Sequence, residues 1–214
     1  MQPGKFIAFE GGEGAGKSTQ ARLLADALTT RGIDCDLTRE PGGTAGAEAI
    51  RNLLLDPPTD PNGEGWGARA EALLFAAARA DHVEKRIRPS ISAGKWVLTD
   101  RFVDSSRAYQ GGAGELGDET ILALHDIGSE SIRPDLTILI EADPERVITR
   151  LAERDGGESD AIGGRDTAYH TAVAAAFRKY AQADPNGFAL IDGTGSVEDV
   201  HMLILQVIAP LLDS

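Results

Sequence analysis

Cysteine, basic residues and long apolar runs are all scarce in this chain, and each scarcity excludes a class of protein. The 214 residues include one cysteine, Cys35, so no disulfide framework can form within the chain and a reducing cytoplasm is expected. We expect Cys35 to be a small buried residue of a strand. No run of 18 apolar residues occurs, and the opening MQPGKFIAFEGG lacks the apolar core of an export signal. We therefore expect neither export nor membrane insertion.

Acidic residues outnumber basic ones, 34 to 21, which gives a formal net charge of −13. An excess of negative charge repels nucleic acid and anionic membranes, so neither is expected as a partner. A ligand that carries phosphates must therefore meet a local basic pocket. The composition, 42% apolar and 26% charged, is typical of a globular protein, and the length fits a single domain over 1–214.

Apolar segments of strand length alternate with longer helical patterns, which is typical of parallel βαβ units. The predicted strands are 5–10, 34–40, 95–101, 135–142 and 188–192. The predicted helices are 17–32, 46–56, 68–91 with an interruption near Pro89, 118–128, 143–155, one that ends near 183, and one from about 196. The Pro- and Gly-rich segment 57–67 is predicted to be a loop. This order predicts a three-layer α/β fold, with a five-stranded parallel sheet flanked by helices and right-handed crossovers.

The segment GGEGAGKS matches the spacing G-x-x-x-x-G-K-[ST] between a predicted strand and a predicted helix, as a P-loop requires. Its glycines let backbone N–H groups turn toward phosphates, and the helix N-terminus favours the same negative charge. Lys17 is expected to reach the β and γ phosphates, and Ser18 to bind Mg²⁺. The residues predicted to bind ATP here are Gly11, Gly12, Glu13, Gly14, Ala15, Gly16, Lys17, Ser18 and Thr19. The motif alone names no reaction, because switches, motors, transporters and kinases share it.

A second group of candidates indicates a second anionic substrate. Asp100 and Arg101 end a predicted strand, at the edge where open parallel sheets bind ligands. Asp100 suits a direct or indirect Mg²⁺ carboxylate, and the planar guanidinium of Arg101 can bridge two anions. Phe75 and Arg79 lie one helical turn apart, so an aromatic ring and a fork of donors share one face that suits a nucleobase. These residues predict a P-loop enzyme with an anionic second substrate.

Several segments resemble the bacterial thymidylate kinase family in order and spacing. They are FEGGEGAGKST (9–19), TREPGGT (38–44), RNLLLD (51–56), AEALLFAAARADHV (70–83), DRFVDSSRAYQGG (100–112) and RPDLTILIE (133–141). The resemblance implies that the γ-phosphoryl group of ATP is transferred to dTMP with Mg²⁺, giving dTDP and ADP for dTTP synthesis and DNA replication. It also implies a cytoplasmic homodimer, which would cover the Ala-rich faces of the long helices.

The resemblance also implies roles for the residues of the acceptor side. Phe75 would stack on thymine, Arg79 would bind its carbonyl edge, and Tyr109 would pack where a 2′-hydroxyl would sit. The set implied to bind dTMP is Glu40, Pro41, Arg51, Phe75, Arg79, Arg101, Ser106, Tyr109 and Gln110, with Arg51 and Arg101 on its phosphate. Glu13 would face the deoxyribose, where it accepts from the 3′-hydroxyl or holds an arginine. The implied catalytic residues outside the lid are Glu13, Lys17, Asp100 and Arg101.

The chain departs from the family pattern in a mobile lid, expected at about 154–167. Gly14 indicates the subgroup with Gly rather than Arg in the P-loop, which takes its catalytic arginine from a D-R-x-E lid motif. That motif aligns here with DAIG, so its arginine is replaced by Ala161. We expect Arg165, or else Arg154, to supply the charge. Arg150, before the lid, is a candidate to stack on adenine.

Two alternatives remain open from the sequence. One is a kinase for another pyrimidine monophosphate, and the other is a nucleotide-dependent switch or partner-binding module that has kept the fold. A switch needs no acceptor site, whereas Arg79, Arg101, Tyr109 and Gln110 are all present. The four histidines, His82, His125, His170 and His201, lack metal-ligand spacing and are expected to be structural or solvated.

Overall fold

Five parallel strands form the centre of the structure, a computed structural model that describes residues 4–142 and 164–212. The strand order is β2-β3-β1-β4-β5. The strands are β1 (Phe6–Glu10), β2 (Cys35–Arg39), β3 (Trp96–Asp100), β4 (Leu136–Glu141) and β5 (Phe188–Asp192). Each predicted strand is confirmed to within one residue at either end. Strands β2 and β3 lie on one side of β1, and β4 and β5 lie on the other, so the strand order changes direction at β1. In an open parallel sheet, ligands bind at the carboxyl ends of the strands at such a point.

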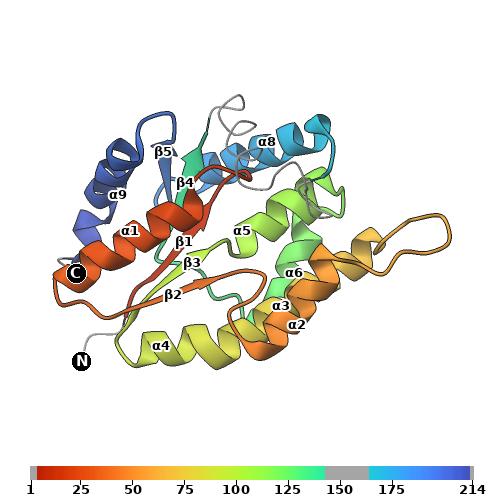
Figure 1. The fold of residues 1–214 in the computed structure, drawn as a ribbon, viewed down its shortest axis with the longest axis horizontal. Helices are drawn as coiled ribbons and strands as arrows, with labels where there is room; N and C mark the ends of the chain where they lie inside the picture. Colours follow the sequence, from red (N-terminus) through yellow and green to blue (C-terminus); the bar gives the residue numbers. More distant parts are fainter. Residues whose placement is uncertain (1–3, 143–163, 213–214) are drawn as a thin grey trace.

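Alternate residues of β1 build the cores on the two faces of the sheet, because successive side chains of a strand point to opposite sides. Ile7 and Phe9 pack with α1 (Lys17–Thr30) and α9 (Val197–Leu212) in one buried cluster. Phe6 and Ala8 belong to a second cluster on the opposite face. Figure 1 shows α1 and α9 on one side of the sheet and α3, α4 and α6 on the other. The three-layer α/β prediction is therefore confirmed.

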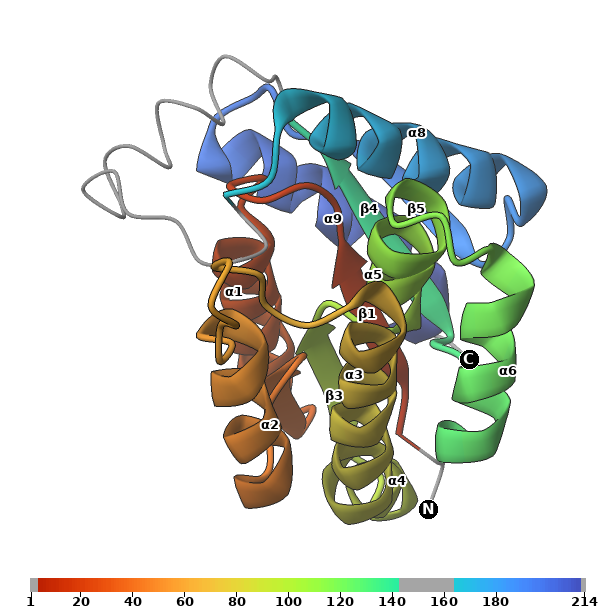
Figure 2. The ribbon, with the colours of Figure 1, turned by 90° about the vertical axis from the view of Figure 1, so that its right-hand side faces the viewer.

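The remaining helices cover the other face of the sheet or lie near its carboxyl edge. They are α2 (Ala45–Leu55), α3 (Ala68–His82), η1 (Val83–Ile87), α4 (Arg88–Ser92), α5 (Val103–Ser106), η2 (Arg107–Ala113), α6 (Asp118–Ser129) and α8 (Thr167–Ala183). Helices α2, α3 and α6 lie side by side in Figure 2. The helices predicted within the described ranges are confirmed. The helix predicted at 143–155, and the lid up to residue 163, lie outside the described residues.

The predicted interruption near Pro89 is a π-helical turn rather than a break. Helix α3 continues through η1 into α4, and the Arg88 N–H donates to the Val83 carbonyl, five residues earlier. Proline has no N–H to donate, and its ring collides with the carbonyl four residues before it in a regular α-helix. The wider turn that precedes Pro89 keeps the helical run continuous past this residue.

Residues 103–113, which no helix was predicted to cover, form the short helix α5 and the π-helical segment η2. The glycines of this segment are typical of a loop, but they serve close packing. A Cβ on Gly112 would lie 3.0 Å from the Cβ of Ala176 on α8. A helix at this place carries Tyr109 and Gln110 to the cavity described below.

The expectation for Cys35 was wrong in burial. The residue lies on strand β2, but this strand is at the edge of the sheet, so Cys35 is half-buried. Burial, followed by the charge of Asp34, raises the pKa of its thiol to about 11, which favours the unreactive thiol form.

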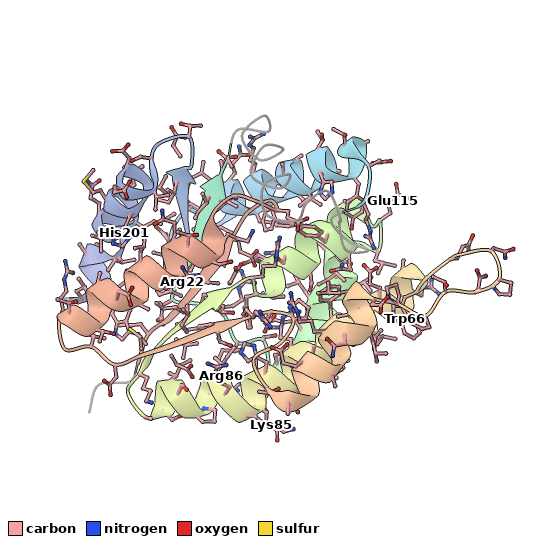
Figure 3. All side chains as sticks on the ribbon, in the orientation of Figure 1. Arg22, Trp66, Lys85, Arg86, Glu115 and His201 are labelled. Atoms are coloured by element: carbon pink, nitrogen blue, oxygen red, sulfur yellow. The ribbon has the colours of Figure 1, made fainter. Side chains whose placement is uncertain are left out.

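The predicted loop 57–67 is confirmed, and the Trp66 indole N–H closes it by donating to the Leu53 carbonyl at 2.8 Å (Figure 3). None of the helices in the described ranges is long and apolar enough to cross a membrane.

Candidate active site

The P-loop connects β1 to α1 in a conformation that depends on its glycines. Gly11, Gly14 and Gly16 have φ values of 136°, 69° and 92°, which L side chains rarely adopt. A Cβ on Gly11 would also lie 2.4 Å from the Ile140 carbonyl oxygen of the neighbouring strand. Lys17 Nζ folds back over the loop and donates to the carbonyls of Gly11 at 3.2 Å and Gly12 at 2.7 Å. Local backbone geometry thus builds a cradle for phosphates.

Lys17 is buried at the start of α1. Burial, and then the positive charge of Arg101, lowers the pKa of its ammonium group to about 8, against the opposing effect of the Asp100 carboxylate. An anion in the cradle would favour the charged form. Lys17 therefore retains its charge at neutral pH, and a bound phosphate would stabilise this charged form further.

Ser18 and Asp100 place two oxygen groups beside the cradle. The Ser18 hydroxyl donates to Asp100 Oδ2. Asp100 ends β3 next to β1, and its Cα pairs with that of Phe9. Within residues 4–142 and 164–212, no group of three or more His, Cys, Asp or Glu could hold a metal. A hydroxyl and a carboxylate fit Mg²⁺ instead, since this ion prefers oxygen ligands and takes one or two from protein, with phosphates and water completing its shell.

One cavity of about 530 Å³ runs from the P-loop to the face of α3. Most of the predicted site residues line it, namely Glu13, Gly14, Gly16, Lys17, Ser18, Thr19, Glu40, Pro41, Arg51, Phe75, Arg79, Asp100, Arg101, Ser106, Tyr109 and Gln110. Leu55, Phe102 and Ser105 line it too and were not among the predicted site residues, and Arg39 at the end of β2 also lines it. The structure thus brings the two groups of candidates into one space.

Arg101 stands between the two ends of this cavity. Its φ of 71° is unusual for a residue other than glycine and marks a strained backbone at this point. The Arg101 Nη1 donates to the Gly11 carbonyl at 3.3 Å, and the guanidinium carbon lies 5.1 Å from the centre of the Tyr109 ring. Burial disfavours the charge, but Tyr109 and Asp100 outweigh it and raise the pKa of Arg101. A permanent positive charge therefore lies where two phosphate chains can meet.

A buried ion pair fixes the far end of the cavity. Glu40, after β2, accepts from Arg79 Nε at 2.8 Å and from His82 Nδ1 at 3.0 Å, and all three side chains are at most 4% exposed. Burial alone would raise the pKa of Glu40, but Arg79 and His82 lower it below its ordinary value. Arg79 Nη2 also donates to the Ser106 hydroxyl at 2.8 Å. The guanidinium of Arg79 is thus held in one orientation at the cavity wall, and His82 is structural, as expected.

Comparison with known proteins decides the family. The family model described as thymidylate kinase matches residues 9–204. A thymidylate kinase of Rhizorhabdus wittichii is 53% identical over 98% of this chain and 99% of the relative, and one of Bradyrhizobium sp. strain BTAi1 is 44% identical over 96% and 89%. The crystal structure of thymidylate kinase from Ehrlichia chaffeensis has a TM-score of 0.75 at 33% identity, covering 96% of this chain and 99% of that one.

The chain belongs to the thymidylate kinase family. The resemblance of the quoted segments is confirmed, and so is the prediction of a P-loop α/β fold. The assignment to the subgroup with Gly in the P-loop stays a prediction. Gly14 does lie in a left-handed conformation at the cavity wall.

In this member of the thymidylate kinase family, a buried acid that the sequence prediction missed joins the two halves of the site. Glu10 Oε1 accepts from the backbone N–H groups of Phe102 at 2.8 Å and Ser105 at 2.9 Å, and Oε2 accepts from the Ser105 hydroxyl at 2.6 Å. Strand β1 thus holds the start of α5 just after Arg101. Burial, and then the negative charge of Asp104, raises the pKa of Glu10 to about 7. An acid at the carboxyl end of the central strand was the only sequence signal.

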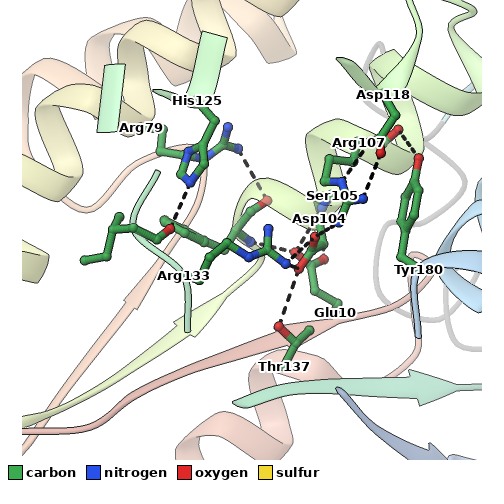
Figure 4. A network of polar contacts seen from close by, with 12 residues as sticks. Glu10, Arg79, Asp104, Ser105, Arg107, Asp118, His125, Arg133, Thr137 and Tyr180 are labelled. Atoms are coloured by element: carbon green, nitrogen blue, oxygen red, sulfur yellow. Dashed lines mark hydrogen bonds and ion pairs between the residues drawn. The ribbon is translucent and has the colours of Figure 1, made fainter. Parts of the chain in front are cut away.

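Asp104 anchors the other side of the same helix and was also missed (Figure 4). It is fully buried and accepts from Arg107 Nη1 at 2.8 Å and from Arg133 Nη2 at 2.9 Å. Arg107 also pairs with Asp118, and its guanidinium carbon lies 3.9 Å from the centre of the Tyr180 ring. These contacts attach α5 and η2 to α6, to α8 and to the segment before β4, and so support the segment that carries the acceptor residues.

Some predicted residues lie elsewhere in this thymidylate kinase family member. Gly11, Gly12 and Ala15 shape the P-loop without lining the cavity. Arg165 lines neighbouring hollows, where it pairs with Glu71 and donates to the Tyr169 hydroxyl. The other lid candidate, Arg154, lies outside the described residues, as do Ala161 and the adenine-stacking candidate Arg150.

Proposed function

We propose that this chain transfers the γ-phosphoryl group of ATP to dTMP, giving dTDP and ADP for dTTP synthesis. One observation carries the proposal: a single cavity extends from the phosphate cradle to the face of α3, where Phe75 and Arg79 line it, with Arg101 between the two ends. A nucleotide switch needs only the cradle. The acceptor end therefore favours the kinase over the switch or partner-binding module.

The acceptor base fits the end of the cavity formed by α3, α5 and η2. Phe75 offers a ring on which a pyrimidine stacks, and Arg79 offers donors fixed by Glu40 for a carbonyl edge. Tyr109 is buried beneath this end, where it packs against the deoxyribose and leaves little room for a 2′-hydroxyl. Ser106 fixes Arg79, and Gln110 completes the wall.

The phosphate of dTMP lies toward the P-loop in this proposal. Arg51, which donates to the Pro41 carbonyl at 2.8 Å, and Arg101 neutralise it from two sides. Glu13 faces the same region of the cavity, where it accepts from the 3′-hydroxyl or holds an acceptor-site arginine. Phosphoryl transfer leaves little covalent work to side chains, so aligning the two phosphates and neutralising their charge supply the acceleration.

Lys17 and the P-loop backbone hold the β and γ phosphates of ATP. Lys17 Nζ exchanges its contacts with the Gly11 and Gly12 carbonyls for phosphate oxygens. Ser18 and Asp100 are the oxygen groups that would hold Mg²⁺, which neutralises phosphate charge when bound. Arg101 then bridges the donor and acceptor phosphates, and no protein group acts as nucleophile.

The lid supplies further charge from the segment before α8. Arg165 forms an ion pair with Glu71 and must leave this position to reach the phosphates. Arg154 is the second candidate for this role, and Arg150 is the candidate to stack on adenine. Ala161 takes the place of the arginine in the family's lid motif, so one of the neighbouring arginines must replace it.

We also place this enzyme in the cytoplasm as a homodimer. Large apolar side chains are exposed on adjoining helices: Leu73 of α3 is 56% exposed, and Ile127 of α6 is 82% exposed. Exposed apolar side chains gathered on neighbouring helices favour a partner surface. We propose that a second copy of the chain packs against α3 and α6, which lie side by side (Figure 2).

Label transfer tests the proposed reaction. With γ-labelled ATP, Mg²⁺ and dTMP, the label is expected in dTDP, and in little inorganic phosphate. If the label is released as inorganic phosphate equally fast with and without dTMP, the result would instead support the switch. Transfer to UMP or CMP as fast as to dTMP would support a kinase for another pyrimidine.

A further inference from the structure

Glu71, on the first turn of α3, holds Gln110 from behind the base end of the cavity. Gln110 Nε2 donates to Glu71 Oε1 at 2.9 Å, and Gln110 is only 3% exposed. The other carboxylate oxygen, Oε2, accepts from Arg165 Nη2. Gln110 lines the cavity, whereas Glu71 does not. Glu71 therefore touches a predicted base-binding residue without contacting the base itself.

The chemistry of Glu71 decides which way the amide of Gln110 points. An ionised carboxylate only accepts hydrogen bonds, and a guanidinium only donates them. With Arg165 on Oε2, the carboxylate stays an acceptor, so only Nε2 of Gln110 can face it. The amide oxygen of Gln110, Oε1, is then left as the acceptor available to a base in the cavity.

We propose that Glu71 is a positioning residue that determines base specificity, because it fixes Gln110 to accept from the N3–H of a pyrimidine. Thymine and uracil carry this N3–H, whereas N3 of cytosine is itself an acceptor. Two acceptors facing each other in a buried site leave both without a hydrogen bond, which is costly. The inference rests on the acceptor end binding dTMP, as proposed above. Arg79 adds a separate selection, since its donors suit a carbonyl at C4 and oppose an amine there.

The substitution Glu71→Gln is expected to reverse the orientation of the Gln110 amide, not merely to loosen it. Arg165 has only donors, so the new amide must turn its oxygen toward Arg165 and its nitrogen toward Gln110. Gln110 then presents its own oxygen to position 71 and turns Nε2 toward the cavity. An N–H group now faces N3 of the base, which suits cytosine and opposes thymine.

Equilibrium binding of dTMP, dUMP and dCMP to the full chain without ATP, measured by titration calorimetry, tests this. In Glu71→Gln, the ratio of dTMP to dCMP affinity is expected to fall about tenfold, which corresponds to one buried mismatched hydrogen bond. The affinity for dUMP should fall in parallel with that for dTMP, since both carry N3–H. Some preference for dTMP persists because Arg79 is unchanged. An equal loss for all three nucleotides, or an unchanged ratio, overturns the proposal.

The double variant Glu71→Gln/Arg165→Met provides a second test. Without a donor-only partner, the amide at position 71 is free to turn its oxygen back to Gln110 Nε2, so the dTMP to dCMP ratio should recover toward that of the wild type. A ratio that stays low contradicts the orientation argument. Glu84→Gln, an exposed acid on the same helical run, is the matched control and should change nothing. A wild-type chain that binds no dTMP would overturn the proposed function as well, whereas normal dTMP binding with an unaltered ratio in Glu71→Gln overturns this inference alone.

Discussion

The two ends of the cavity are built in different ways. At the donor end, the phosphate cradle consists of residues 11–18, a continuous segment whose backbone is shaped by glycines. At the acceptor end, Glu40, Arg79 and Ser106 come from three separate segments and are joined by buried hydrogen bonds. The first end depends on local conformation, and the second depends on long-range packing and on charges paired away from water.

This difference predicts different responses to mutation. A backbone cradle presents N–H groups that no side-chain substitution removes, except where a glycine conformation is lost. A buried ion pair, in contrast, leaves an uncompensated charge when one partner is removed. Changes at the acceptor end should therefore disturb folding and dTMP binding together, whereas changes at the donor end should act mainly on ATP and rate.

The largest expected effect lies in neither end but in the lid. If a lid arginine supplies catalytic charge, Arg165→Ala or Arg154→Ala should lower the single-turnover rate by about 10³ to 10⁵, as the removal of an arginine finger does. Single-turnover measurement with saturating ATP and dTMP reports this step. Arg22→Ala, on the solvent side of α1, is the control (Figure 3). Rates within a few-fold of wild type for both lid variants would contradict a role for either arginine.

Lys17 tests the donor end. Lys17→Met should lower kcat by about 10² to 10³, the cost of removing one preorganised charge from the transition state. Because the pKa of Lys17 is lowered to about 8, its charge is lost above that pH, so kcat/KM for ATP in the wild type should fall above pH 8. Lys85→Met, an exposed lysine paired with Asp81, should leave both values unchanged. A flat pH profile from 7 to 9.5 would show that Lys17 does not titrate in this range.

Glu10 tests the connection between the two ends through stability. Its folded-state pKa of about 7 exceeds the ordinary value of 4.5, so between these values the native state keeps a proton that the unfolded state has lost. The contribution of Glu10 to stability therefore declines as pH rises through this window, by about 3 kcal/mol in total. In Glu10→Gln this decline should be absent.

Denaturant unfolding at pH 5, 6, 7 and 8 measures the effect. The free energy of unfolding of the wild type minus that of Glu10→Gln is expected to decrease from pH 5 to about 7 and to level off by pH 8. Ser105→Ala keeps the carboxyl group but removes a hydrogen bond that lowers the pKa of Glu10, so the decline should persist and extend to higher pH than in the wild type. Parallel curves for the wild type and Glu10→Gln would show that Glu10 does not titrate in this window.

Glu13 should give the smallest effect of the set. It belongs to the P-loop by sequence but is proposed to face the acceptor. Glu13→Ala is therefore expected to reduce kcat/KM for dTMP about tenfold, the loss of one charged hydrogen bond, with a much smaller change in ATP affinity. Steady-state titration of each substrate separates the two. A change confined to ATP binding would assign Glu13 to the donor end.

The same division explains what could be predicted from the sequence. The P-loop was predictable because its spacing and its glycine conformations are local properties of eight consecutive residues. The strands were predictable because apolar runs mark them. Phe75 and Arg79 could be predicted to lie together because their spacing of four residues puts them on one face of a helix.

The residues that were missed depend on contacts between distant segments. Glu10 is a strand-end acid, and nothing local indicates that it holds the start of α5, 92 to 95 residues further on. Glu71 has the pattern of an ordinary acid in the first turn of a helix, until Gln110 and Arg165 are placed on its two oxygens. The segment 103–113 has the glycines of a loop, although packing against α8 makes it helical.

The most direct test of the central claim, that donor and acceptor ends serve one reaction, is ADP release with Mg²⁺ and ATP in the presence and absence of dTMP, dUMP, UMP and CMP. ADP release is expected to depend on the acceptor, with dTMP strongly preferred over the other three nucleotides. Equal ADP release with and without dTMP would contradict it.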